Sequence, residues 1–136
     1  MIFLGRNKIF SSLFTLMACL AFQSISACDS TLIIAHRGAS GIAPENTLSA
    51  FQLAIDIGVD YLELDVRKSS DDSLMVIHDA TVNATTNGSG FVNSKTYSEL
   101  RALDAGSWFS SAYIGEQIPT LFEVLLLAKN NGAKVC

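Results

Sequence analysis

The stretch Thr31-Leu32-Ile33-Ile34-Ala35-His36-Arg37-Gly38 decides the fold, because an apolar run gives way abruptly to a polar turn that contains glycine. The run is short and rich in β-branched side chains, which is typical of a parallel strand buried on both faces. A helix should follow, with Asn46 or Thr47 as its N-cap and Gly58 as its stop. Strand, loop, helix and glycine stop together predict one β/α unit.

A second strand is expected at residues 59–68, and two of its polar side chains suggest chemistry. Alternate side chains of a strand point to opposite faces, so Glu63 and Asp65 should share a face. Two carboxylates held close together repel each other unless a cation neutralises them. The pair therefore predicts a site for a hard divalent cation, Ca2+ or Mg2+. The alternative is an edge strand whose polar face meets water.

The two histidines of the chain each end a predicted strand, His36 after the first and His78 after a short strand at 74–77. Parallel α/β proteins place their functional groups at the carboxyl ends of strands. Because histidine titrates near neutral pH, such a pair can supply a general base and a general acid. Arg37 offers a planar fork that suits phosphate oxygens, or alternatively an ion pair with Glu45.

The segment 80–118 differs from the rest in being rich in Gly, Ser, Thr and aromatic residues. We interpret it as an insertion between a barrel strand and its helix, with a short helix at 98–103. Thr120 and Glu123 then form a capping box that predicts a strong helix. Residues 133–136 have the character of a further strand.

The N-terminal residues 1–27 have the pattern of a signal peptide. Arg6 and Lys8 precede an apolar stretch, and small residues follow it. The sequence Ile25-Ser26-Ala27-Cys28 resembles a bacterial lipobox, which would make Cys28 the lipidated first residue of the mature protein. An ordinary cleavage beside an incidental cysteine is the alternative. Either way the protein is expected to be exported, as a periplasmic protein or a lipoprotein anchored to the membrane.

Composition limits the classes of protein that remain. The chain has 136 residues, 49% hydrophobic and 16% charged, which indicates a globular domain and excludes low-complexity disorder. A net charge of −4 argues against a nucleic-acid partner, which would require a basic surface. The length accommodates one domain but not a complete (β/α)8 barrel of about 250 residues.

Several motifs occur in one order and together resemble the glycerophosphodiester phosphodiesterase family. The similarity extends from residue 32 to about residue 132. The motifs are His36-Arg37-Gly38, Pro44-Glu45-Asn46-Thr47, Glu63-x-Asp65, His78-Asp79, Thr86-Asn87-Gly88-x-Gly90, Leu103-Asp104-Ala105-Gly106-x-Trp108-Phe109 and Ile118-Pro119-Thr120-Leu121.

This resemblance implies hydrolysis of glycerophosphodiesters to an alcohol and sn-glycerol 3-phosphate with a divalent cation, Ca2+ or Mg2+. Glu63 and Asp65 would be the metal ligands, and His36 and His78 the acid–base pair. Arg37 would contact the phosphate. The substrate would be a small molecule, and a lipidated Cys28 would add contact with the membrane.

The resemblance also implies a fold, the (β/α)8 TIM barrel of the phospholipase C-like phosphodiesterases. Residues 30–136 would supply its first three or so strands and the insertion, as a truncated domain. The family pattern places a further glutamate ligand on the strand after the second helix, beyond Cys136, so activity of this segment alone is doubtful. Two alternatives stay open: an inactive secreted or lipid-anchored fragment that only binds a metal or a partner, and a phospholipase D-like relative.

Overall fold

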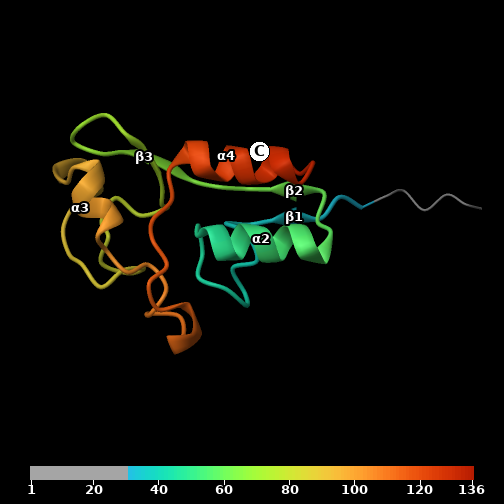
Figure 1. Cartoon of the computed structure of the whole chain (residues 1–136), viewed down its shortest axis with the longest axis horizontal. Coiled ribbons are helices and arrows are strands. Elements are labelled where there is room, and N and C mark those ends of the chain that lie inside the picture. Colours follow the sequence, from blue (N-terminus) through green and yellow to red (C-terminus); the bar gives the residue numbers. More distant parts are fainter. Residues whose placement is uncertain (1–30) are drawn as a thin grey trace, which may run out of the picture. The chain divides into compact units, whose positions relative to one another are not determined.

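The computed structural model describes residues 31–136, and its central feature is a sheet of three parallel strands. The strands are β1 (Ile34–Ala35), β2 (Tyr61–Leu62) and β5 (Lys134–Val135), in the order β1-β2-β5. A helix connects each strand to the next (Figure 1). This arrangement is the repeating unit of a β/α barrel, as the sequence predicted. The predicted signal peptide and Cys28 lie outside the described residues.

The first helix, α2 (Leu48–Ile57), begins and ends at residues the sequence had indicated. The Thr47 hydroxyl accepts a hydrogen bond from the backbone N–H of Ala50 at 3.2 Å, so Thr47 is the N-cap. Gly58 ends the helix with a φ of 85°, a left-handed conformation that glycine adopts without steric cost.

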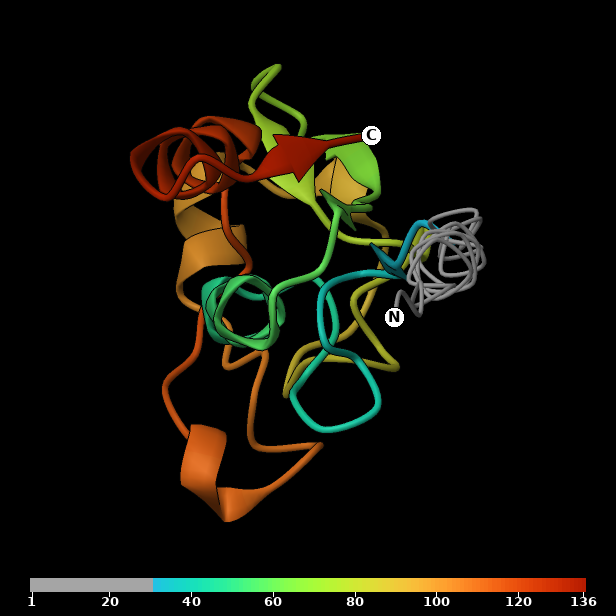
Figure 2. The same ribbon diagram turned by 90° about the vertical axis from the view of Figure 1, so that its right-hand side faces the viewer.

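The second helix, α4 (Leu121–Asn130), also follows its local signals. Thr120 and Glu123 form the predicted capping box. The helix packs beside α2 on one face of the parallel strands, as Figures 1 and 2 show. Within residues 31–136 no helix combines the length and the apolar character needed to cross a membrane. The core between sheet and helices is formed by Ala35, Phe51, Ala54, Leu62, Val76, Val124 and Ala128.

The first strand is not buried on both faces, and that prediction was wrong. Leu32, Ile33 and Ile34 are each more than half exposed, whereas Ala35 is only 8% exposed. The physical reason is position, because β1 is an edge strand of the described sheet. Its apolar run reflects a surface that residues 31–136 do not cover.

The predicted single strand at 59–68 is divided into β2 and a separate β3 (Val66–Lys68). β3 pairs antiparallel with β4 (Leu74–Val76), so β4 is the return strand of a hairpin and lies outside the parallel sheet. The division falls where Asp65 donates its backbone N–H to the Asn46 side chain at 3.4 Å. A contact from a distant loop thus replaces the strand ladder at this point.

The segment between β4 and α4 has a small core of its own. It contains η1 (Val92–Ser94), α3 (Tyr97–Arg101) and η2 (Ser111–Tyr113), with α3 close to the helix expected at 98–103. Arg101 ties the segment to α4 through two hydrogen bonds to the Glu123 carboxylate, at 2.9 and 3.2 Å. Its core comprises Met75, Ile77, Val82, Val92, Leu100, Ala105 and Ile118.

Candidate active site

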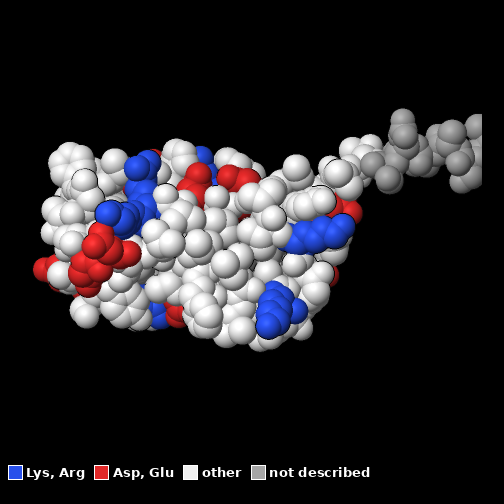
Figure 3. All heavy atoms as spheres, turned by 90° about the horizontal axis from the view of Figure 1, so that it is seen from above, with Lys and Arg blue, Asp and Glu red and all other residues white. Residues whose placement is uncertain are grey.

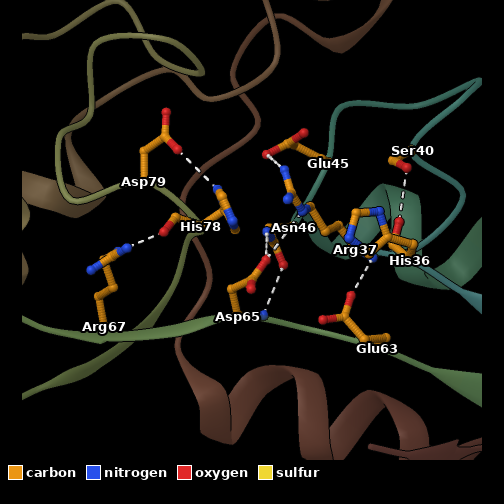
Figure 4. A network of polar contacts seen from close by, with 10 residues as sticks. All are labelled: His36, Arg37, Ser40, Glu45, Asn46, Glu63, Asp65, Arg67, His78 and Asp79. Atoms are coloured by element: carbon orange, nitrogen blue, oxygen red, sulfur yellow. Dashed lines mark hydrogen bonds and ion pairs between the residues drawn. The ribbon is translucent and has the colours of Figure 1, made fainter.

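All five functional residues predicted for the barrel segment belong to one group of neighbouring side chains (Figure 4). His36 and Arg37 follow β1, and Glu63 and Asp65 follow β2. His78 comes two residues after β4, whose hairpin brings it to the same place although β4 runs antiparallel to β3. His36 is exposed and the other four are partly buried, so the group is open to small molecules.

The two carboxylates are each held by a neutral donor from the loop after β1. The backbone N–H of Arg37 donates to Glu63 Oε2 at 2.9 Å, and Asn46 Nδ2 donates to Asp65 Oδ2 at 3.1 Å. Figure 4 shows both carboxylates on the same side of their chain segment. The predicted common face is therefore present, even though neither residue belongs to a strand.

Arg37 lies between two acidic side chains. Its Nη1 is 3.0 Å from Glu45 Oε1, which is the ion pair the sequence analysis had kept as an alternative. Its buried Nε is 3.3 Å from Asp65 Oδ2 but makes no hydrogen bond there, so this second contact is purely electrostatic. The guanidinium thus brings positive charge to the edge of the carboxylate pair.

The loop that carries these groups has an unusual backbone. Arg37 and Asn46 both have a φ of 57°, and the N–H of Asn46 donates to the carbonyl of Arg37 at 3.0 Å. Such left-handed conformations cost about 1–3 kcal/mol each and concentrate at functional sites. Between them Gly38, with a φ of 78°, passes so close to Ala50 that a Cβ would lie 2.8 Å from its carbonyl carbon.

His78 is oriented by its neighbours. Its Nδ1 lies 2.9 Å from Asp79 Oδ1, and Arg67 Nε donates to the His78 carbonyl at 2.6 Å. An ionised carboxylate only accepts hydrogen bonds, so this contact requires the proton on Nδ1. Nε2 of a neutral His78 is then an acceptor, free to take or relay a proton.

The donor set fits a hard divalent cation held in part by its substrate. Residues 31–136 contain no cluster of three or more His, Cys, Asp or Glu side chains able to enclose a metal ion. The hydrogen bonds to Glu63 and Asp65 use one oxygen of each carboxylate. Mg2+ is commonly bound by one or two carboxylates together with substrate phosphates, which matches this pair.

Sequence reasoning missed three residues that shape the site. Asn46 was interpreted as a possible helix cap, yet its side chain binds Asp65. Asparagine enters the left-handed region more readily than most residues, and this tendency could have indicated the unusual backbone at this position. Asp79 was quoted only as part of a motif, although its place beside a histidine is suggestive. Nothing in the local pattern pointed to Arg67, because its contact depends on the hairpin.

Residues 36–135 match the glycerophosphoryl diester phosphodiesterase family. The chain belongs to this family. It is 54% identical over 97 residues to the glycerophosphodiester phosphodiesterase of Caldanaerobacter subterraneus subsp. tengcongensis, covering 71% of this chain and 40% of the relative.

Solved glycerophosphodiester phosphodiesterase structures agree in fold. The Agrobacterium tumefaciens enzyme superposes with a TM-score of 0.74 at 48% identity, covering 77% of this chain and 45% of that one. An Oleispira antarctica phosphodiesterase was solved in complex with the product sn-glycerol-3-phosphate. It superposes with a TM-score of 0.75 at 41% identity, covering 77% of this chain and 42% of that one. The resemblance and the barrel fold inferred from sequence are thus confirmed, and the chain spans about two fifths of the length of these relatives.

Proposed function

We propose that this protein hydrolyses glycerophosphodiesters to an alcohol and sn-glycerol 3-phosphate. The observation that carries the proposal is that both histidines, Arg37 and the Glu63/Asp65 pair lie in one group of side chains, in a chain that belongs to the family. Support for the substrate class comes from the Oleispira antarctica relative and its product complex.

The histidines suit proton transfer at the two ends of the scissile bond. Both histidines belong to the group of side chains drawn around Asp65 in Figure 4. One removes a proton from the nucleophile, either water or the glycerol 2-hydroxyl, and the other donates a proton to the departing alcohol. With water as the nucleophile, the protonated base then loses its proton to solvent and the acid regains one from solvent. With the 2-hydroxyl as the nucleophile, a cyclic phosphate forms first, and water opens it with the two histidines in exchanged roles, which restores both protonation states.

The charged residues suit the phosphate. Arg37 presents its positive charge at the carboxylate pair, where it can hold a phosphate oxygen. Glu63 and Asp65 would hold Ca2+ or Mg2+ through the oxygens that their hydrogen bonds leave unused. When bound, such a cation supplies electrostatic stabilisation of charge on the phosphoryl oxygens.

Release of glycerol 3-phosphate from glycerophosphocholine by the full-length protein tests this function. His36→Ala should lower kcat at least about 100-fold, the lower range for loss of a general acid or base. Glu63→Ala should also lower kcat strongly, because it removes one of the two proposed cation ligands. Asp56→Ala changes an exposed carboxylate on α2 and should leave turnover intact. Wild-type turnover in either site variant would refute these roles, and no turnover in the wild type would favour the inactive, binding-only alternative.

We further propose that the protein is exported and that Cys28 carries an acyl anchor. The support is the charged, apolar and small-residue pattern of residues 1–27. The intact mass of the protein from a membrane fraction tests this, because acylation of Cys28 adds the mass of the acyl chains to a polypeptide that begins at that residue. An unmodified mass would refute the anchor.

A further inference from the structure

We propose that Asn46 is a positioning residue that, linked to the backbone of Arg37, orients Glu63 and Asp65 for a divalent cation. This inference rests on the proposed function, because it takes the two carboxylates as the cation ligands. Asn46 is 4% exposed and its side chain is committed to Asp65, so it is placed to act on that carboxylate and not on substrate.

Asn46 holds Asp65 at two points. Its Nδ2 donates to the carboxylate at Oδ2, 3.1 Å away, and its Oδ1 accepts the backbone N–H of Asp65 at 3.4 Å. One amide therefore restrains both the side chain and the backbone of the same residue. The restraint leaves Oδ1 of Asp65 as the oxygen available for a cation.

Glu63 is held in a similar way by Arg37, which also has a left-handed backbone conformation. The N–H of Arg37 donates to Glu63 Oε2 at 2.9 Å, which leaves Oε1 as its available oxygen. The two holding positions are joined directly, because the Asn46 N–H donates to the Arg37 carbonyl at 3.0 Å. The spacing of the two carboxylates is thereby set by one loop.

The left-handed backbone makes this linkage possible. Both residues have a φ of 57°, a region that asparagine enters more readily than most residues. Glycine adopts positive φ as easily, so Asn46→Gly should keep the loop path and the Asn46–Arg37 backbone bond. This variant removes the amide alone, which separates the positioning role from the conformation of the chain.

The test is calorimetric titration of the metal-free full-length protein with Mg2+ and with Ca2+, each alone. Asn46→Gly should raise the cation Kd by 10–100-fold, the usual effect of losing a group that orients a metal ligand. Its metal-free Tm should fall, because the variant removes a buried side chain with two hydrogen bonds, so both proteins are titrated well below their melting transitions. Asn83→Gly is the control: it removes another asparagine side chain, an exposed one whose Oδ1 accepts the N–H of Gly90 seven residues away, and it should leave the Kd unchanged.

Activity provides a second readout. Glycerol 3-phosphate release by Asn46→Gly should recover at high cation concentration, whereas a merely structural loss would not. A wild-type Kd in Asn46→Gly, with the wild type both binding cation and turning over, would overturn this inference alone. Absence of both binding and turnover in the wild type would overturn the proposed function and this inference with it.

Discussion

At the scale of single residues, the contact between His78 and Asp79 is the most consequential for the chemistry. In the proposed reaction, an ionised Asp79 would accept a hydrogen bond from Nδ1 of His78, which leaves Nε2 as the nitrogen that exchanges a proton with the substrate. General acid–base catalysis contributes about 10²–10⁴-fold to the rate, and loss of the partner of His78 should remove part of this contribution. We therefore expect Asp79→Ala to lower kcat about tenfold or more, with a smaller change in KM. Steady-state kinetics on glycerophosphocholine measure this.

The control for that variant is Asp56→Ala, whose exposed carboxylate lies on α2. Asp79→Asn sharpens the test, since its amide can donate to Nδ1 and so admits the tautomer with the proton on Nε2. An unchanged kcat in both Asp79 variants would show that His78 needs no such partner.

Gly38 offers a prediction about packing. A Cβ at this position would lie 2.8 Å from the carbonyl carbon of Ala50 and would meet a φ of 78°. Gly38→Ala should therefore destabilise the protein by about 1–3 kcal/mol, the usual cost of overpacking. Gly41→Ala is the matched control, because no atom lies within 4 Å of its added Cβ. Urea unfolding of both variants checks this, and equal midpoints would contradict it.

At the scale of elements, the carboxylate of Asp104 accepts hydrogen bonds from three backbone N–H groups of the loop between Asp104 and Gly115. Hydrogen bonds from the backbone N–H groups of Ser107, Gly115 and Gly106 lower the pKa of Asp104 to about 2. Because the folded pKa lies below the ordinary value of 3.8, the stabilisation is full above about pH 4 and is lost as the pH falls through about 2.

Asp104→Asn should therefore lower the urea midpoint at pH 6, because the neutral amide is a weaker acceptor for these N–H groups. The difference from the wild type should shrink as the pH falls toward 2, where the wild-type carboxyl group also becomes neutral. Asp56→Asn, at an exposed position on α2, serves as the control. A difference that stays constant between pH 6 and pH 2 would show that the charge of Asp104 does not stabilise the loop.

Elements defined by neighbouring residues were predictable from the sequence, and those defined by distant contacts were not. The caps of α2 and α4 lie where Thr47, Gly58 and Thr120 indicated. The strand expected at 59–68 is interrupted because the Asn46 side chain takes the backbone N–H of Asp65, a contact across 19 residues. The Glu63/Asp65 pair could be singled out because its spacing is local. Asn46 could not be assigned to Asp65, because that contact joins residues 19 positions apart.

At the scale of the whole described unit, two apolar surfaces are exposed. The first surface comprises Leu32 and Ile33, which precede the edge strand β1, and Ile34, its first residue. The second comprises Phe122, Leu125 and Leu126 on α4, which are 44–72% exposed. Figure 3, which views the molecule from the α4 side, shows a broad uncharged area in its middle. The chain spans about two fifths of relatives that share this fold, and in a complete (β/α)8 barrel neighbouring β/α units cover surfaces of this kind.

We therefore expect residues 31–136 produced alone to be marginally stable. Exposed apolar surface and unpaired strand edges favour association over a unique folded state. The isolated segment should melt without a sharp transition and bind a hydrophobic dye, and it should turn over glycerophosphocholine weakly or not at all. The longer Caldanaerobacter subterraneus relative, of which this chain spans 40%, should melt cooperatively and bind little dye when measured alongside. A cooperative melt of the segment with cation-dependent release of glycerol 3-phosphate would show instead that the catalytic groups and their supporting core are already sufficient within these residues.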